Sequence, residues 1–243
     1  MNIIKLNAIG STNSYLINLG KNEVLEDPTI VVSVIQEKGR GQLGSHWQST
    51  AHKSLTFSVF KRFRDLPAQR MSVITFAVSI AIHKVLKKLS LPNTTIKWPN
   101  DIMSYSKKVA GILIENQVKQ GKIISSVIGV GLNVNEENFN NLAQATSILL
   151  ATGTKHNLDE LLLKVSKAIL EELEKVENGE FQYLKATYEN SLFKKNTVSV
   201  FENNTGNRFN GIIKGVTDTG EIVIENEQEL LNKYNLKELK YLL

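Results

Sequence analysis

The chain has 243 residues, of which 42% are hydrophobic and 22% are charged. This composition is typical of a globular protein and excludes a disordered, collagen-like or coiled-coil chain. Lys and Arg number 29 against 24 Asp and Glu, and the whole excess lies in residues 36–70, where seven basic side chains accompany two acidic ones. A charge confined to one stretch argues against a general nucleic-acid binder, which usually carries several basic patches.

The residue types that are missing narrow the chemistry further. The chain has no cysteine, which excludes disulfides, thiol nucleophiles and cysteine zinc sites. Its four histidines are scattered, so a histidine-rich metal site is not expected. No run of about 18 apolar residues is present, and the first residues lack the apolar core of a signal peptide. We therefore expect a cytoplasmic protein.

Strands and helices are expected to alternate through the first part of the chain. Ser11, Thr12 and Asn13 supply N-cap chemistry ahead of a short helical stretch. Pro67 suits the first turn of a helix, and apolar residues recur at helical spacing from there to Leu89. The expected elements are strands at 2–6, 29–36 and 55–60, helices at 14–19 and 67–89, and a polar, glycine-rich loop at 38–50.

The second part of the chain changes character near residue 195. Two β-rich runs about Gln120 and Gly121 predict a hairpin. After residue 195, short alternating strands separated by Asn-Asn-Thr-Gly and Asp-Thr-Gly turns favour a small barrel. The expected elements are a strand at 94–98 that ends at Pro99, hairpin strands at 109–118 and 122–134, helices at 159–176 and 181–190, and two domains, 1–193 and 194–243.

Residues 39–44, GRGQLG, match the G-x-G-x-x-G pattern of dinucleotide-binding loops and follow a strand. In that fingerprint the glycines open a helix, whereas here the sequence SHW leads into another strand, which disfavours a dinucleotide site. A hairpin loop without a chemical role is the plain alternative. Three glycines beside Arg40 and Lys38 favour instead a loop whose amides and cations bind a phosphate or a carboxylate.

Three further motifs place polar residues or glycines at strands. WPND, residues 98–101, is either a plain turn or a site where Asp101 holds an adenosine hydroxyl or a metal. KKVAGILIE, residues 107–115, begins with a solvated strand start or with a fixed cation for a transferring phosphate. In GVGLNVN, residues 129–135, two glycines leave one strand face bare for a flat ligand, although a bulge would explain one of them.

These motifs, preceded by GSTN at residues 10–13, resemble those of the biotin protein ligases in their order and spacing. The resemblance implies an α+β fold with a mixed β-sheet flanked by helices, as in class II aminoacyl-tRNA synthetases, and a small C-terminal Src-homology-3-like β-barrel. It also implies an enzyme that uses ATP and Mg²⁺ to form biotinyl-5′-adenylate from biotin. Biotin is then transferred to a lysine on the biotin carboxyl carrier domain of acetyl-CoA carboxylase or a related carboxylase.

The matching motifs also assign expected site residues by position. Arg40 and Lys108 are the expected catalytic cations, because a carboxylate that attacks a phosphate needs positive charge and amide donors. Asp101 is in addition a possible metal ligand. The expected biotin contacts are Ser11, Thr12, Asn13, Gln36, Gly39, Arg40, Gly41, Gln42, Lys108, Gly111, Gly129 and Gly131. The expected ATP contacts are Arg40, Trp47, Asn100, Asp101, Lys108 and Asn133.

The chain departs from its relatives in the glycine loop, where many of them carry further arginines and this chain has Gln42 and Ser45. That difference bears on loop closure and on retention of the adenylate. Relatives that double as repressors carry a helix-turn-helix domain before the ligase motifs, and no DNA-binding domain is expected in the ten residues before Ser11. A lipoate ligase of the same fold and a nucleic-acid-binding protein are the alternatives; the RGQLG loop and the terminal barrel favour biotin.

Overall fold

The computed structural model describes residues 1–139 and 142–242, and its larger part is a seven-stranded mixed sheet. The strand order is β1-β2-β3-β7-β6-β5-β4; β1 runs parallel to β2 and all other neighbours are antiparallel. The strands are β1 (Asn2–Ile9), β2 (Thr29–Gln36), β3 (Ser54–Pro67), β4 (Thr94–Lys97), β5 (Asp101–Ser104), β6 (Lys107–Lys119) and β7 (Lys122–Asn133).

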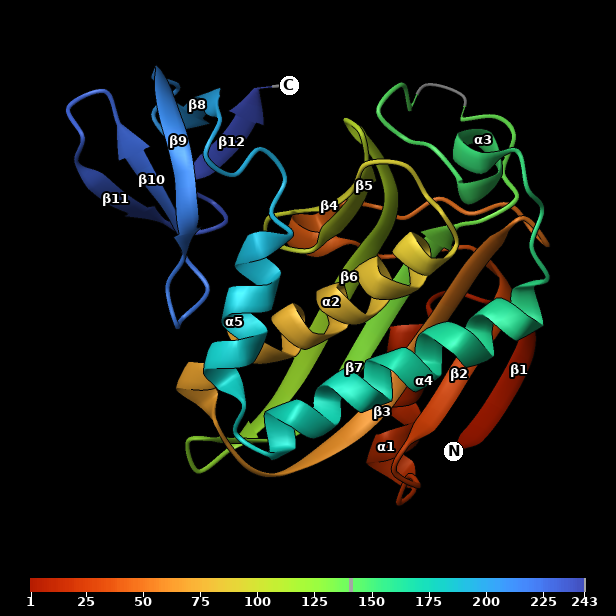
Figure 1. Cartoon of the computed structure of the whole chain (residues 1–243). Helices are drawn as coiled ribbons and strands as arrows, with labels where there is room; N and C mark the ends of the chain where they lie inside the picture. Colours follow the sequence, from red (N-terminus) through yellow and green to blue (C-terminus); the bar gives the residue numbers. More distant parts are fainter. Residues whose placement is uncertain (140–141, 243) are drawn as a thin grey trace.

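Helices cover the two faces of this sheet unequally (Figure 1). The helices α2 and α4 lie side by side across one face with α5 next to α2, whereas α1 packs against β2, β3 and β7 on the other face. The short helix α3 lies beyond one end of the sheet. The helices are α1 (Thr12–Asn22), α2 (Ser72–Lys88), α3 (Ile148–Thr152), α4 (Leu158–Glu177) and α5 (Phe181–Asn190).

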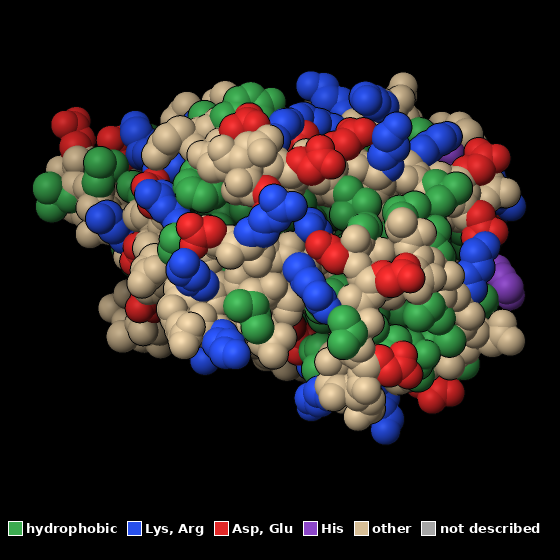
Figure 2. Space-filling model, turned by 90° about the horizontal axis from the view of Figure 1, so that it is seen from below, with side chains coloured by type: hydrophobic (Ala, Val, Ile, Leu, Met, Phe, Trp, Pro, Cys, Tyr) green, Lys and Arg blue, Asp and Glu red, His purple; other side chains and the backbone are tan. Residues whose placement is uncertain are grey.

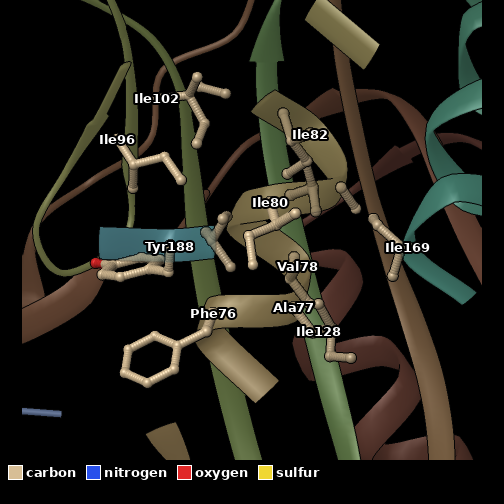
Figure 3. Packing of buried hydrophobic residues seen from close by; sticks show 14 of the residues in the cluster. Phe76, Ala77, Val78, Ile80, Ile82, Ile96, Ile102, Ile128, Ile169 and Tyr188 are labelled. Carbon is tan, nitrogen blue, oxygen red and sulfur yellow. The ribbon is translucent and has the colours of Figure 1, made fainter. Parts of the chain in front are cut away.

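The main apolar core lies between the sheet and α2. This helix buries residues around most of its circumference, as expected for a helix enclosed by a sheet and two other helices. In Figure 3, Ile80 of α2 lies among side chains from three other elements: Ile128 of β7, Ile169 of α4 and Tyr188 of α5. Because strand side chains alternate, Gly129 and its neighbours at every second position face the opposite side of the sheet. That side holds α1 and the candidate site.

The C-terminal part forms a second, antiparallel sheet of five strands in the order β11-β10-β9-β8-β12. Its buried side includes Phe201, whose ring contacts the rings of Phe209 and Tyr241. In Figure 1 this unit stands beside α5 and the β4 end of the large sheet. Its strands are β8 (Val198–Asn203), β9 (Arg208–Val216), β10 (Ile222–Asn226), β11 (Leu231–Tyr234) and β12 (Leu239–Leu242).

The turn between β9 and β10 joins the two units. The Asp218 carboxylate accepts bonds from Arg70 and Lys185, at 2.9 Å each, and the Trp98 indole nitrogen donates to the Gly220 carbonyl at 2.8 Å. The two ion pairs hold the pKa of Asp218 below its ordinary value. One cluster of buried apolar residues runs through both units, and the domain division at residue 193 stays a prediction.

Several expected elements are confirmed, among them the strand at 29–36, the hairpin about Gln120 and Gly121, and the helix at 181–190. The helix expected from Pro67 was placed too early. Pro67 still pairs with Lys122 in the ladder between β3 and β7, and a 3-10 turn (Ala68–Arg70) precedes α2. The short elements α3, β5, β11 and β12 were not expected, because so few residues show little periodicity of their own.

Within the described part of the chain, no helix combines the length and the apolar character needed to cross a membrane.

Candidate active site

Two cavities lie next to each other, with volumes of about 650 Å³ and about 500 Å³. The first is lined by the N-terminus of α1, the glycine loop, the middle of β6 and β7, and residues of β12. The second is lined by residues 48–50 and by the segment after β7. Both cavities share His46, Trp47, Lys97, Asp101, Lys108 and Gln144. All the predicted site residues except Gly39 line one of the two cavities, with Asn100 in the first and Asn133 in the second.

The first cavity has a polar inner end built by α1, β2 and β3. The backbone nitrogen and the hydroxyl of Thr12 both donate to the Gln36 side-chain oxygen, at 2.8 and 3.0 Å. The hydroxyl of Ser58 lies within hydrogen-bond distance of Thr12 Oγ1 and Asn13 Oδ1. Ser11 is the N-cap of α1, which explains why Thr12 and Asn13 project from the first turn. Gln36 is half-buried, the other four side chains are buried, and their hydrogen bonds hold them in fixed orientations.

The glycines of the site make room for side chains of this same protein. A Cβ atom on Gly129 would lie 2.4 Å from Asn13 Oδ1, and one on Gly131 would lie 2.2 Å from the Trp47 ring. The face expected to be bare for a flat ligand is therefore covered at Gly131 by the Trp47 indole. A Cβ on Gly39 would meet the Trp47 carbonyl and one on Gly41 would meet the Ser45 hydroxyl, both at 2.3 Å. These glycines therefore allow neighbouring residues of the loop and the floor to approach the backbone closely.

The glycine loop, residues 39–47, folds back on itself. Arg40 and His46 form a bridge, the Gly41 nitrogen donates to the Ser45 carbonyl at 2.7 Å, and the Trp47 nitrogen donates to the Gly39 carbonyl at 3.0 Å. A single 3-10 turn (Gln42–Gly44) lies at its tip, and the chain then continues to β3. No helix begins at the glycines, so the dinucleotide-binding alternative is wrong for this loop.

Two lysines stand where the cavities meet. Lys108 pairs with Asp101 at 2.6 Å, and its ammonium lies 5.5 Å from the centre of the Trp47 ring. The ammonium of Lys97 lies 5.1 Å from the centre of the Tyr241 ring, which comes from β12. Burial lowers the pKa of Lys97, and neighbouring Lys108 lowers it further, while Asp101 opposes the shift. The junction therefore concentrates positive charge that one carboxylate only partly offsets.

The two asparagines expected on the ATP side are engaged by backbone carbonyls. The Asn100 amide nitrogen donates to the Ile112 carbonyl, and that of Asn133 donates to the Thr146 carbonyl at 3.0 Å. Both side chains are buried. They tie neighbouring segments to the sheet, and each keeps its amide oxygen and a second N–H that can meet a ligand.

Asp101 is the carboxylate at the junction, and it is paired with a lysine. Among residues 1–139 and 142–242, no group of three or more His, Cys, Asp or Glu is placed to hold a metal. Mg²⁺ commonly binds through one or two carboxylates together with substrate phosphates. The donors present thus fit a magnesium ion that arrives with a nucleotide, and do not fit a resident all-protein metal site.

Three site residues were missed in the sequence. Ser58 lies opposite Gly129 in the ladder, and the small polar residues alternating in LTFSVF were a signal for it. Glu115 pairs with Arg40 at 2.6 Å. Its signal in the sequence was a single acidic residue at the end of the apolar run VAGILIE. Tyr241 gave no signal, because its place in the cavity wall depends on how the small unit packs.

Much of the basic stretch 36–70 is neutralised locally. Arg40 pairs with Glu115, Lys53 with Glu137, Lys61 with Asp27, and Arg70 with Asp218. On the face shown in Figure 2, basic and acidic side chains are interspersed. Four of the seven basic side chains of the stretch are thus paired, and the face shown in Figure 2 carries no continuous basic surface of the kind that a nucleic-acid-binding protein needs.

Comparison with known proteins agrees with this geometry. The sequence pattern of the biotin/lipoate A/B protein ligase family matches residues 6–133. The bifunctional ligase/repressor BirA of Bacillus spizizenii is 26% identical over 237 residues, covering 96% of this chain and 72% of that protein. The biotin--[acetyl-CoA-carboxylase] ligase of Mycobacterium tuberculosis is 34% identical over 143 residues, covering 58% of this chain and 52% of that protein. The matched region thus spans only about half the length of some relatives.

The fold is also found among solved structures. The biotin protein ligase from Aquifex aeolicus, in complex with biotin and ATP, superposes with a TM-score of 0.81 at 25% identity, covering 99% of this chain and 98% of that chain. The expected mixed sheet with flanking helices and a small C-terminal β unit is therefore confirmed. Since the family pattern spans more than half of the chain, this protein belongs to the biotin/lipoate A/B protein ligase family.

Proposed function

We propose that this protein is an ATP-dependent biotin protein ligase. The observation that carries the proposal is the pair of adjoining cavities whose common wall holds Lys97 and Lys108. An enzyme that joins a carboxylic acid to a nucleotide needs two pockets that meet at the reacting atoms, with positive charge where the anionic groups come together. The polar inner end of the first cavity would take biotin, and the second cavity would take the adenosine part of ATP.

The inner end of the first cavity favours biotin over lipoate. The ureido ring of biotin has two N–H donors and a carbonyl acceptor, whereas the dithiolane ring of lipoate has neither. Gln36 Oε1 receives both bonds from Thr12, which leaves the Gln36 amide nitrogen as a donor, and Asn13 Oδ1 keeps a second lone pair beside the bond that it accepts from Ser58. A dithiolane would offer no acceptor to the Gln36 amide nitrogen, and a site that leaves a polar group unpaired disfavours the ligand.

The chemistry proceeds in two steps, and the residues act mainly by position and charge. In the first, an oxygen of the biotin carboxylate attacks the α-phosphorus of ATP, and the bond to the β-phosphate breaks to release pyrophosphate. Lys108 and Arg40 would offset the negative charge of the two reactants. In the second, the amine of a carrier lysine attacks the acyl carbon, loses a proton and displaces AMP.

Trp47 is well placed to contact both substrates. Its indole covers Gly131 between the two cavities, and its ring nitrogen is buried without a hydrogen-bond partner among the described residues. A buried donor of this kind is expected to find an acceptor, which a bound ligand would provide. Magnesium bound to the ATP phosphates would neutralise part of their charge, with Asp101 as the residue able to reach it.

The carrier and the location of the reaction follow from the same proposal. The name of the Mycobacterium tuberculosis relative specifies acetyl-CoA carboxylase, and we propose the biotin carboxyl carrier domain of such a carboxylase as the acceptor. Because the reaction consumes ATP, the cytoplasm is the expected compartment.

Pyrophosphate release in the presence of ATP and Mg²⁺ tests the proposal, with biotin, lipoate or no acid added. Release that depends on biotin and is much weaker with lipoate is expected. Release with lipoate alone would reassign the chain to the lipoate branch of its family, and no release with either acid would refute adenylate formation.

A further inference from the structure

Glu115 is an acidic side chain that the proposed reaction does not use, and it bonds to Asn13 and Arg40, which line the first cavity. It lies on β6, on the same strand face as Gly111 and Leu113, both of which line the cavity. Its side chain is 31% exposed, and its carboxylate points toward the N-terminus of α1 and the glycine loop, with which it makes its polar contacts. A carboxylate beside a site for anionic reactants is electrostatically unfavourable, so Glu115 is expected to have a specific role there.

One oxygen of Glu115 receives two hydrogen bonds from different parts of the site. The Asn13 amide nitrogen donates to Glu115 Oε2 at 2.8 Å, and Arg40 Nη2 donates to the same oxygen at 2.6 Å. Asn13 is itself fixed, because its amide nitrogen also donates to the Leu113 carbonyl at 3.2 Å and its oxygen accepts from Ser58. Glu115 is thus fixed by its bond from Asn13, and Arg40 is fixed by its bond to Glu115.

The glycine loop packs on the floor through Trp47, but most of its other hydrogen bonds are internal, so its polar attachment to the sheet is this contact. The bonds from the Gly41 and Trp47 nitrogens close the loop on itself without joining it to the floor. Among the described residues, Arg40 to Glu115 is the ion pair that connects residues 39–47 to the sheet. Arg40 uses one of its five N–H donors there, so the remaining donors stay free for an anionic ligand.

We propose that Glu115 is a positioning residue: it orients the Arg40 guanidinium over the first cavity before the substrate carboxylate and phosphate arrive. The inference rests on the proposed function and assigns a role to a residue outside the matched motif positions. Arg40 is 42% exposed in its side chain, so the ion pair adds little to the stability of the fold. Its contribution is preorganisation, which lowers the entropic cost of binding.

The first test measures the dissociation constant of biotin, without ATP, by isothermal titration. Glu115→Gln is expected to weaken biotin binding about tenfold through lost preorganisation, with little change in the thermal midpoint. Gln117→Ala is the matched control, because Gln117 lies two residues further along the same strand face and bonds to Ser125 instead. Unchanged or tighter binding in Glu115→Gln would overturn the proposal, the latter because it would identify Glu115 as a repulsive charge.

A double-mutant cycle separates positioning from an independent effect. If Glu115 acts through Arg40, then Glu115→Gln should add little to the loss caused by Arg40→Gln, and the double variant should bind biotin nearly as well as Arg40→Gln alone. Losses that multiply would show that Glu115 acts without Arg40 and would refute the positioning role.

A further measurement needs no ligand and therefore stands apart from the proposed function. Trypsin cleaves after arginine, and an Arg40 held by Glu115 is protected in the ligand-free protein. Cleavage after Arg40 should become severalfold faster in Glu115→Gln than in the wild type or in Gln117→Ala. If the wild type releases no pyrophosphate but this difference appears, the ion pair is real and the proposed function is wrong; equal cleavage rates would reject the ion pair itself.

Discussion

The floor of the first cavity and the glycine loop above it are built in different ways. On the floor, Thr12, Asn13 and Ser58 are at most 3% exposed, and each has several hydrogen-bond partners. In the loop, Leu43 is 61% exposed, and the backbone bonds mostly join loop residues to one another. The groups that would recognise a neutral polar ligand are therefore fixed by the fold. Part of the positive charge, by contrast, lies on the glycine loop, which is less firmly attached.

Because of this difference, the cations of the two regions are held with different rigidity. Lys108 is fixed on β6 beside Asp101, while Arg40 is attached through one ion pair to Glu115. Substitutions on the floor should therefore change the chemistry or the shape of the site, and substitutions in the loop should chiefly change how long ligands stay bound.

Replacement of the fixed cation should have the largest effect. Lys108→Ala is expected to lower the rate of adenylate formation by about 10²–10³-fold, because it removes a preorganised charge at the reacting atoms. The ion pair with Asp101 is partly exposed, so unfolding should be little affected. Pyrophosphate release and thermal unfolding measure the two effects. Lys107→Ala is the control on the neighbouring exposed lysine; a similar loss there, or near-normal release in Lys108→Ala, would contradict the assignment.

A substitution under Trp47 should have the next largest effect. Gly131→Ala would place a Cβ 2.2 Å from the indole ring, which must then leave the floor. We expect about tenfold weaker binding of ATP and a destabilisation of ~1–3 kcal/mol from overpacking. Titration with ATP and tryptophan fluorescence would report the displacement. Gly10→Ala meets only the Lys38 Cβ at 4.0 Å and serves as the control; equal fluorescence and affinity in both variants would disprove the steric role.

A charge added to the loop should have a smaller effect. Gln42 lines the first cavity, in the loop where the resemblance to the biotin protein ligases implies further arginines. Gln42→Arg is expected to slow release of the adenylate about threefold through added electrostatic attraction, without changing the rate at which it forms. Rapid filtration of the preformed complex measures release. A faster release, or a changed rate of formation, would contradict the division of roles between loop and floor.

The smallest effect concerns Lys97 and appears only in alkaline solution. Its pKa lies below the ordinary value of 10.5, mainly because of burial, so it loses its proton at lower pH than an exposed lysine. If its charge attracts the ATP phosphates, wild-type ATP affinity should fall as pH rises through that pKa. Lys97→Arg should retain its affinity there, about twofold or more above the wild type, because arginine stays protonated. Lys119→Arg is the control, and parallel pH profiles for all three proteins would exclude this role.

Local patterns in the sequence predicted many elements and the positions of the motifs. The β-branched run of β2, the left-handed turn at Gln120 and Gly121, and the apolar periodicity of α4 depend on neighbouring residues, and all appear in the structure. The start of α2 was missed because pairing with Lys122 keeps Pro67 in a strand.

Contacts between distant segments could not be predicted in the same way. The glycine at 131 indicated close approach, but the sequence did not show that the approaching group is Trp47. Likewise, nothing local to Glu115 indicates that it meets Arg40, 75 residues earlier in the chain. Such pairings follow from sheet topology and loop packing, which the one-dimensional pattern does not encode.

The last strand, β12, belongs to the small unit, yet Leu239, Tyr241 and Leu242 line the first cavity, and Tyr241 lies next to Lys97 of the large sheet. Chimeras that exchange this small unit between relatives would thus also replace one wall of the first cavity. A break between the two units for domain dissection would therefore divide the first cavity rather than isolate it.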